Sequence, residues 1–510
     1  MAWRFSSLCI SLVLALLMSL ASQSCYGLRS FGFDIHHLFS DPVKGIMGFH
    51  ELPDKGTREY YAAMVHRDRV FRGRRLAGDH QTPLTFSPGN DTYQIGAFGF
   101  LHFANVSVGT PALSFLVALD TGSDLFWLPC NCTSCVRGIK ASNGKTIEFN
   151  IYDVKGSSTS QNVLCNSSLC EEQGQCPSSG GSCPYRVEYL SNGTSTTGFL
   201  VEDVLHLITD DDQTKVADTR ITFGCGQVQT GAFLDGAAPN GLFGLGMGNL
   251  SVPSILAKEG LTSNSFSMCF GSDGLGRITF GDNSSLDQGK TPFNLRALHP
   301  TYNITITQIV VGGNASDLEF HAIFDSGTSF TSLNDPAYTQ ITHSFDSLIK
   351  QQRYSNSDSD LPFEYCYNLS PNEKVQAPIL NLTMKGGDNY FVMDPIVTVT
   401  GENLNLLCLG VVKSNNLNII GQNFMTGYRV VFDRENMILG WKESNCYDDE
   451  FSNLPINPSH SPAVSPAMAV NPEATSNQST DPERLPSSHS FKIKPSFAFL
   501  MAIFLLLAIF

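Results

Sequence analysis

Basic residues are scarce in this sequence. The chain has 510 residues, of which 32 are Lys or Arg and 47 are Asp or Glu, so its formal net charge is −15. An acidic chain of this kind argues against nucleic acid and anionic membrane surfaces as partners. No Lys-Ser/Thr pair follows the glycine-rich stretch at residues 241–248, so a phosphate-binding loop is not expected either. Hydrophobic residues make up 42% of the total, which indicates a chain that is mostly globular.

Long hydrophobic runs are also missing, because both apolar runs at the ends of the chain are short. Residues 8–20 follow Arg4 and precede small residues, which is typical of a signal peptide, expected over residues 1–27. Residues 497–510 fall below the roughly 20 apolar residues of a transmembrane helix and resemble the discarded tail of a GPI-anchor signal, expected over residues 491–510. A genuine tail anchor is the alternative. The candidate attachment residues are Ser487, Ser488, Ser476 and Asn477. We therefore expect a protein of the secretory pathway, held at the cell surface by a lipid anchor or extracellular.

The cysteine count agrees with secretion. Of fourteen cysteines, cleavage after Gly27 would remove Cys9 and Cys25 and leave twelve that can pair completely, whereas cleavage after Ser24 would leave thirteen. Metal-ligand spacing is the alternative interpretation of the first three remaining cysteines, but disulfides are favoured in a secreted chain. Seven cysteines lie between residues 130 and 183, so at least one bridge must leave this cluster, towards residue 225, 269 or 446. The twelve are Cys130, Cys132, Cys135, Cys165, Cys170, Cys176, Cys183, Cys225, Cys269, Cys366, Cys408 and Cys446.

Sequons for N-glycosylation are numerous and fit the same route. Each is weak evidence alone, but twelve together agree with a signal peptide. They stand at Asn90, Asn105, Asn131, Asn166, Asn192, Asn249, Asn283, Asn303, Asn314, Asn368, Asn381 and Asn477.

The composition changes along the chain and suggests its domains. Residues 28–77 are rich in basic residues and end near Arg74 and Arg75, which indicates a prosegment, possible up to about residue 91, that contacts the acidic body at neutral pH. Residues 447–490 are rich in Pro and Ser and predict a solvated stalk. Short runs of β-branched and aromatic residues, separated by turn residues, predict an all-β body between them. These runs are residues 100–108, 113–119, 185–189, 220–223, 277–280, 304–311 and 428–432. One helix is expected over residues 336–351, with Asp335 as N-cap and an apolar stripe that includes Leu348 and Ile349.

One constellation occurs twice in the body. An apolar run at residues 113–119 leads into Asp120-Thr121-Gly122-Ser123, and residues 321–324 lead into Asp325-Ser326-Gly327-Thr328. An isolated Asp-Thr/Ser-Gly would be weak, but two, each after an apolar strand, are hard to attribute to chance. An apolar-apolar-Gly segment follows each, at residues 242–244 and 419–421, and glycine there lets backbones approach closely. The chain therefore predicts two similar lobes, over residues 92–290 and 291–446, each with one carboxylate in a shared site.

These motifs resemble those of the pepsin-like aspartic proteases, in particular the plant nepenthesin-type group with a GPI-anchor signal. The resemblance covers roughly residues 95–446 and implies a bilobal all-β fold with a central cleft. It implies that Asp120 and Asp325 are the catalytic pair, that Trp127 lies beside the site, and that Tyr189 is the tyrosine of the flap over the cleft. The residues after Tyr189, Leu-Ser-Asn-Gly, differ from the usual Tyr-Gly of the family. The same resemblance implies a disulfide between Cys366 and Cys408.

The chemistry requires these residue types on physical grounds. Two neighbouring carboxylates cannot both ionise easily, so they share one proton, and the ionised one can accept a proton from a trapped water as general base. Thr121 and Ser326 can hydrogen-bond across the two turns, while Ser123 and Thr328 can orient the carboxylates from outside. The glycines Gly122 and Gly327 permit the tight turns. This chemistry needs no metal or cofactor.

The sequence therefore predicts a secreted, monomeric aspartic endopeptidase that acts on peptides or proteins at acidic pH and is made as a zymogen. Two other classes remain open. One is a catalytically inactive binding module on the same fold, such as a glycosidase inhibitor, although such relatives usually lose one carboxylate. The other is a structural surface glycoprotein, which the sequons and the proline-rich stalk alone support.

Overall fold

The computed structural model describes about three fifths of the chain. The described residues are 31–37, 61, 102–140, 146–170, 173–176, 178, 180–189, 193–208, 216–234, 238–271, 275–282, 286–294, 300–355, 361–370, 375–401 and 404–446. All of them belong to the first of two compact units, Met1–Ile456 and Asn457–Phe510. No helix within these described ranges is long and apolar enough to cross a membrane.

Several predicted features lie outside the described residues. They are the signal peptide, most of the prosegment, the stalk, the GPI-anchor signal with Ser476, Asn477, Ser487 and Ser488, and the sequons at Asn90, Asn192 and Asn283.

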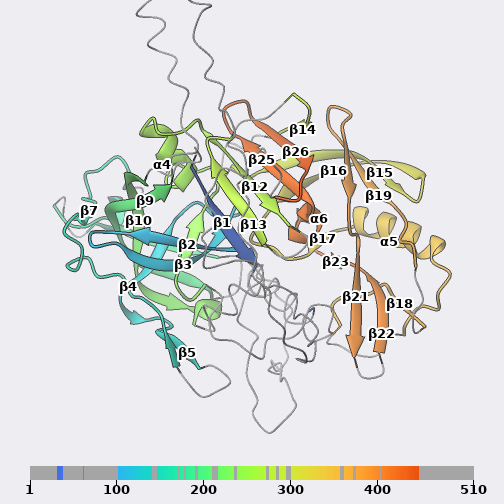
Figure 1. The fold of residues 1–510 in the computed structure, drawn as a ribbon, viewed down its shortest axis with the longest axis horizontal. Coiled ribbons are helices and arrows are strands. Elements are labelled where there is room, and N and C mark those ends of the chain that lie inside the picture. The colour runs from blue at the N-terminus through green and yellow to red at the C-terminus, as the bar shows by residue number, and fades with distance from the viewer. Residues whose placement is uncertain are drawn as a thin grey trace, which may run out of the picture. The chain divides into compact units, whose positions relative to one another are not determined.

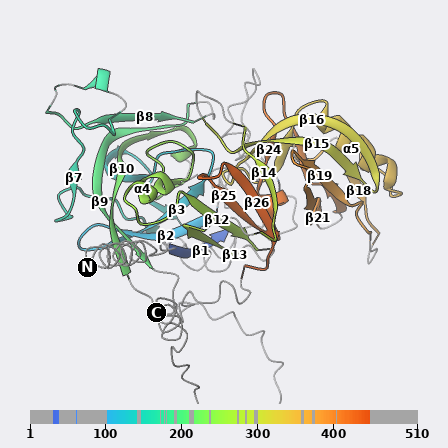
Figure 2. The same ribbon diagram turned by 90° about the horizontal axis from the view of Figure 1, so that it is seen from above.

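A 14-stranded sheet forms the larger part of the fold, in the order β14-β26-β25-β12-β13-β1-β2-β3-β11-β4-β10-β9-β7, with β8 paired to β9 (Figures 1 and 2). Its strands are β1 (Phe31–His37), β2 (His102–Val108), β3 (Leu113–Asp120), β4 (Trp127–Ser134), β7 (Gln161–Asn162), β8 (Pro184–Glu188), β9 (Ser195–Ile208), β10 (Val216–Thr230), β11 (Leu242–Gly244), β12 (Ser265–Phe270), β13 (Leu275–Phe280), β14 (Gly289–Pro292), β25 (Tyr428–Asp433) and β26 (Ile438–Glu443). The last two come from the C-terminal lobe: β25 pairs with β12, and β26 pairs with β25, so one sheet joins the two lobes.

The second lobe is built on a 7-stranded sheet in the order β20-β19-β15-β16-β24-β17-β23, with a separate 3-stranded sheet β18-β22-β21. The strands are β15 (Asn303–Val311), β16 (Asn314–Phe324), β17 (Thr331–Leu333), β18 (Cys366–Asn368), β19 (Leu380–Met384), β20 (Asn389–Val392), β21 (Ile396–Gly401), β22 (Leu404–Leu409), β23 (Val411–Lys413) and β24 (Ile419–Ile420). The small remaining elements are β5 (Gly138–Lys140), β6 (Thr146–Glu148), η1 (Gln173–Gln175), η2 (Gly231–Phe233), α4 (Val252–Lys258) and α6 (Gln422–Met425). The all-β prediction is confirmed.

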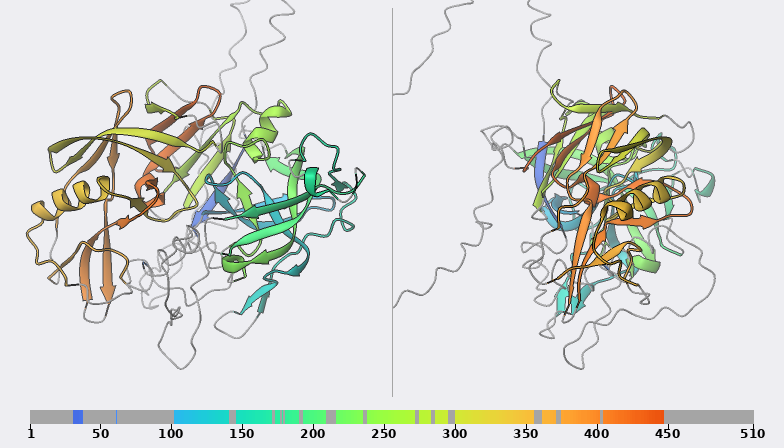
Figure 3. Two further views of the ribbon diagram at one scale, coloured as in Figure 1. Left: turned by 180° about the vertical axis from the view of Figure 1, so that it is seen from behind. Right: turned by 90° about the vertical axis from the view of Figure 1, so that its right-hand side faces the viewer.

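The expected helix is α5 (Ala337–Leu348), which lies against β15 and β16 (Figures 1 and 3). It is shorter than predicted, because Ile349 already has an extended backbone with φ −84° and ψ 130°. Tyr338, Ile341 and Phe345 are buried as expected, but Leu348 is 37% exposed, so the apolar stripe is narrower than the spacing predicted. At its other end the N-cap residue is Pro336 and not Asp335 as predicted, although Asp335 accepts a hydrogen bond from the backbone N–H of Thr339 at 3.3 Å.

Strand β1 belongs to the predicted prosegment. It pairs antiparallel with β13 over six residue pairs and with β2 over two, and so occupies a position inside the larger sheet. The basic charge of residues 28–77 predicted contact with the acidic body, but not a strand within it.

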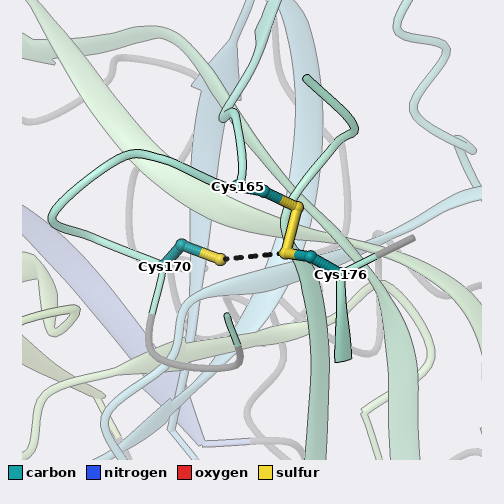
Figure 4. Close-up of side chains that lie close together, drawn as sticks. All are labelled: Cys165, Cys170 and Cys176. Carbon is teal, nitrogen blue, oxygen red and sulfur yellow. Dashed lines mark hydrogen bonds between the residues drawn. A yellow bond between two sulfur atoms is a disulfide. The ribbon is translucent and has the colours of Figure 1, made fainter. Parts of the chain in front are cut away.

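Six disulfides join the twelve cysteines. They are Cys130–Cys225, Cys132–Cys135, Cys165–Cys176, Cys170–Cys183, Cys269–Cys446 and Cys366–Cys408. The bridge that leaves the cysteine-rich segment therefore runs to residue 225. Three sulfur atoms, of Cys165, Cys170 and Cys176, lie within 4.8 Å of one another (Figure 4). Each belongs to a disulfide, and a disulfide sulfur is not the thiolate that binds a metal.

The described sequons differ in exposure. Six asparagines are exposed: Asn105, Asn131, Asn166, Asn249, Asn314 and Asn368. Asn303 is only 4% exposed and accepts a hydrogen bond from Asn294, and Asn381 is 8% exposed and donates to Asn389. Burial sets Asn303 and Asn381 apart from the six exposed asparagines, and glycosylation of the sequons stays a prediction.

Candidate active site

The turn that carries Asp120 begins at the end of a buried strand. Strand β3 is buried over its last six residues, and its parallel neighbour β11 places Gly244 opposite Asp120. A side chain at Gly244 would collide with the backbone of Asp124, so only glycine lets the two segments pass this closely. The backbone N–H of Leu245 then donates to the Asp120 carbonyl at 2.9 Å and fixes the start of the turn.

The turn that carries Asp325 is built in the same way. Strand β16 ends at Phe324, and β24 runs parallel beside its last two residues. The following Gly421 lies against Phe330, where an added Cβ would stand 2.6 Å from the backbone carbonyl carbon. The two apolar-apolar-Gly segments therefore occupy the positions that the sequence pattern predicted.

The two turns bring their carboxylates together. A Cβ atom at Gly122 would lie 3.0 Å from Oδ1 of Asp325 and 3.1 Å from Oδ1 of Asp120. A Cβ atom at Gly327 would lie 2.9 Å from Oδ1 of Asp325 and closer still to Oδ1 of Asp120. Each glycine is thus bracketed by both carboxylates, and any side chain there would displace one of them.

Hydroxyl groups join the turns across the lobes. The Thr121 Oγ1 donates to the Phe324 carbonyl at 3.2 Å and accepts from the Ser326 N–H at 2.9 Å. The Ser326 Oγ in turn donates to the Leu119 carbonyl at 3.2 Å and accepts from the Thr121 N–H at 3.0 Å. Both side chains are buried, with at most 2% of their surface exposed, so these four bonds are shielded from water.

Each carboxylate is held by two further donors. The Gly122 N–H donates to Oδ1 of Asp120 at 2.8 Å, and Ser123 Oγ donates to Oδ2 at 2.7 Å. On the other turn, the Gly327 N–H donates to Oδ1 of Asp325 and Thr328 Oγ1 to Oδ2, both at 2.8 Å. Asp120 is 7% exposed, and Asp325 is partly buried. The arrangement repeats almost atom for atom, which suits two carboxyl groups that share one proton.

An aromatic group lies next to Asp120 in the first lobe. The Trp127 Nε1–H donates to the Tyr189 hydroxyl at 2.9 Å, and burial, followed by the negative charge of Asp120, raises the pKa of Tyr189 well above its ordinary value. Phe233 makes edge contacts with both rings, with centroid distances of 4.8 Å to Trp127 and 4.9 Å to Tyr189. Phe233 could not be predicted from the sequence, because it stands in the short 3-10 helix η2 rather than in a periodic segment.

A residue of the predicted prosegment lies near the second turn. Tyr61 is 6% exposed, and its ring centroid is 6.0 Å from that of Phe330 and 5.8 Å from that of Phe363. Phe330 follows Thr328 by two residues. Burial, followed by the negative charge of Asp394, raises the pKa of Tyr61 above its ordinary value.

Two family models match the body of the chain. The Xylanase inhibitor N-terminal family matches residues 102–282, and the Xylanase inhibitor C-terminal family matches residues 301–443. Among solved structures, soybean Basic 7S globulin aligns with a TM-score of 0.54 over 68% of this chain and 92% of its own, at 22% identity. At that identity the likeness concerns the fold alone.

Similar sequences cover nearly the whole chain. Aspartyl protease family protein 1 of Arabidopsis thaliana is 56% identical over 97% of this chain and 98% of its own length. Aspartic proteinase-like protein 1 of the same plant is 36% identical over 93% of each chain. Aspartic proteinase nepenthesin-2 of Nepenthes gracilis is 28% identical over 86% of this chain and 98% of its own length.

Proposed function

Because the chain belongs to the plant pepsin-like aspartic proteases and is an aspartic-type endopeptidase, we propose that Asp120 and Asp325 are the two carboxylates that carry its reaction. The observation that best supports this assignment is the pairing of the two turns, with both Oδ1 atoms close to Gly122 and Gly327. The donors on the Oδ2 atoms, Ser123 and Thr328, hold the carboxylates in this orientation.

The proposed reaction uses one shared proton. With one carboxylate ionised and the other protonated, a water between them gives a proton to the ionised group while its oxygen attacks the peptide carbonyl carbon. The protonated group donates its proton to the carbonyl oxygen, and a neutral tetrahedral diol forms. The diol then collapses: the newly protonated carboxyl gives its proton to the amide nitrogen, the ionised carboxylate takes the proton of one diol hydroxyl, and the C–N bond breaks. These transfers return the two carboxyl groups to their starting state. Since one carboxylate must remain protonated, we expect activity at acidic pH.

The same residues argue against the inactive binding module. A protein that only binds a partner needs neither carboxylate, whereas here each one keeps two hydrogen-bond donors in mirrored positions. The matched family models carry the words xylanase inhibitor, so binding to a xylanase is the second candidate function. It becomes the better one only if the folded protein does not cleave peptides.

The test is cleavage of a peptide library by the processed protein from pH 2 to pH 7, with Asp120→Asn and Asp325→Asn. We expect each substitution to lower kcat by at least about a thousandfold without unfolding the protein. The side-chain amide of the introduced Asn cannot accept and return the proton that the two carboxyl groups share. Asp317→Asn is the matched control, since Asp317 is exposed and its contact with Gln308 is kept by an amide oxygen. Cleavage that survives in either active-site variant would contradict the proposed dyad.

We also propose that residues 28–77 are a prosegment that keeps the precursor inactive. Two observations support it: β1 lies between β2 and β13, and Tyr61 packs against Phe330 and Phe363 near the Asp325 turn. A precursor that is fully active while it retains residues 28–77 would contradict this proposal.

The proposed location is the cell surface, through a signal peptide and a GPI anchor. The support is the pair of short apolar runs at the two ends of the sequence. Phosphatidylinositol-specific phospholipase C should release the protein from intact cells. Retention, together with an intact C-terminus in mass spectrometry, would instead indicate a tail anchor.

A further inference from the structure

The two aspartate turns differ at one hydrogen bond. The side-chain Nε2 of Gln422 donates to the backbone carbonyl of Ser326, the residue after Asp325, at 2.5 Å. In the first lobe the corresponding carbonyl belongs to Thr121, and no donor to it is found among the described residues. The position that corresponds to Gln422, one residue after the glycine of the apolar-apolar-Gly segment, is Leu245, whose side chain cannot donate.

Gln422 is fixed in place by its own surroundings. It is 5% exposed and begins helix α6, and its backbone N–H donates to the Thr328 carbonyl at 2.8 Å. The next residue, Asn423, donates from its backbone to the Ser329 carbonyl at 3.0 Å and from its side chain to the Gly410 carbonyl at 2.7 Å. The amide of Gln422 therefore approaches Ser326 from a buried segment whose backbone is hydrogen-bonded to the residues after Asp325.

The bond to Ser326 reaches the carboxylate of Asp325 through one peptide group. The carbonyl of Ser326 and the N–H of Gly327 belong to the same peptide group, and that N–H donates to Oδ1 of Asp325 at 2.8 Å. A donor on the carbonyl polarises the peptide group and strengthens the hydrogen bond that its N–H gives. It also fixes the plane of the peptide, and with it the direction of the N–H.

We propose that Gln422 is a positioning residue, which through the Ser326–Gly327 peptide orients Oδ1 of Asp325 and makes the two aspartates inequivalent. The catalytic part of this inference rests on the proposed function of the dyad. The first lobe lacks such a donor among its described residues, so the difference between the lobes is built into the position after the glycine. Gln422 does not touch the reacting atoms and acts only through Ser326 and Gly327.

The experiment compares Gln422→Met, which keeps the length of the side chain but cannot donate, with Gln422→Glu. For Gln422→Met we expect kcat about threefold to tenfold lower, KM within about twofold, and the acidic limb of the kcat/KM profile about 0.3 to 0.5 pH units higher. In Gln422→Glu the protonated carboxyl can still donate, so its activity should approach wild type at the acidic end and fall more steeply as the pH rises. Gln229→Met is the matched control, because Gln229 is 2% exposed and donates to the Gly226 carbonyl at 2.9 Å on β10. It should lower thermal stability and leave the pH profile unchanged.

A second measurement does not depend on activity. In protein labelled with 13C-carbonyl serine and 15N-glycine, the amide proton of Gly327 should move upfield in Gln422→Met, because its hydrogen bond to Asp325 weakens, and should titrate at higher pH. If Gln422→Met loses only stability, with unchanged pH profile and unchanged Gly327 shift, Gln422 is merely structural and the proposal is wrong. If the wild type does not cleave peptides but the Gly327 shift responds as expected, the proposed protease site fails while the positioning role stands.

Discussion

The turn of Asp120 and the turn of Asp325 hold their carboxylates with the same hydrogen bonds, but different residues surround the two turns. The first lobe contains four disulfides and covers its turn with the aromatic group of Trp127, Tyr189 and Phe233. The second lobe has the Cys366–Cys408 disulfide, helix α5 and the buried amide of Gln422. The two turns are alike in the hydrogen bonds that hold the carboxyl groups. They differ in the residues that pack around the turns. The surroundings can therefore give each aspartate a different role.

The largest expected effect concerns the disulfides of the two lobes. In the chain-entropy account, removal of a bridge costs more when the sequence separation is larger, 95 for Cys130–Cys225 and 42 for Cys366–Cys408. We expect the double variant Cys130→Ala/Cys225→Ala to lose about 4.7 kcal/mol of unfolding free energy and Cys366→Ala/Cys408→Ala about 3.9 kcal/mol. Guanidinium unfolding of both variants measures the difference. The opposite order would show that packing around the bridges, not loop length, distinguishes the lobes.

The second prediction concerns the hydroxyls that join the lobes. Thr121→Ala and Ser326→Ala each leave one buried N–H and one buried carbonyl without their partner, at about 1–3 kcal/mol per group. Because the four bonds form a symmetric set, we expect equal losses of about 2–6 kcal/mol for the two single variants, and a double variant that loses less than their sum. Thermal unfolding and kcat should both report this equality. Clearly unequal losses of stability in the two single variants would mean that the four hydrogen bonds are symmetric in geometry but not in energy.

The third prediction concerns the aromatic group that only the first lobe contributes. Tyr189→Phe removes the acceptor of the Trp127 indole N–H, which should lower kcat/KM about tenfold through a loss of about 1–1.5 kcal/mol in the transition state. Tyr390→Phe is the matched control in the second lobe, since the buried Tyr390 hydroxyl donates to the Phe424 carbonyl at 2.6 Å. It should lower stability by a similar amount with kcat/KM unchanged. Equal losses of activity in both variants would contradict a special role of the first lobe.

The smallest expected effect is on the pH dependence of stability. Burial lowers the pKa of His206, but its hydrogen bonds with the Gly109 carbonyl and with Asp218 outweigh burial and raise the pKa above 6.5. A raised pKa stabilises the fold below pH 6.5, and this contribution is lost as the pH rises through the folded value. His206→Gln should therefore lower the unfolding free energy by up to about 1 kcal/mol at pH 5, with no difference at pH 9.

A carboxylate in the second lobe has a pKa shift of the opposite sign. Hydrogen bonds from Thr339 and Lys413 lower the pKa of the exposed Asp335 below 3.8, so its contribution is present above pH 3.8 and is lost in acid. Asp335→Asn should therefore lower the unfolding free energy less than His206→Gln does at pH 5, and its effect on the unfolding free energy should vanish at the most acidic pH. Thermal unfolding of both variants from pH 2 to pH 9 tests the pair. An Asp335→Asn effect that grows in acid would contradict this assignment.

The carboxylates could be predicted from the sequence because each motif is local. Asp120 and Asp325 both follow an apolar strand, and the turn hydroxyls and glycines stand within three residues of them. The bonds between Thr121 and Ser326, 205 residues apart, were also predictable, because two copies of one turn can meet only in a few ways.

The supports behind the turns could not be predicted, because long-range packing decides them. Gln422 reaches Ser326 across 96 residues, and neither Phe233 nor Tyr61 belongs to a motif. The same limit applies to the burial of Asn303 and Asn381. Their sequons are complete in the sequence, but burial in strands β15 and β19 removes them from the surface.

The shared sheet has a consequence for the order in which the chain can fold during synthesis. Strand β12 needs β25 as its neighbour, and the Cys269–Cys446 disulfide next to this pairing spans a sequence separation of 177. At about 5–20 residues per second, a ribosome needs roughly 9 to 35 seconds between the two cysteines. During that time β12 has one open edge of backbone N–H and C=O groups, which can pair with other chains. A chaperone that covers this edge would therefore raise the yield of folded protein more than one that acts on the finished chain.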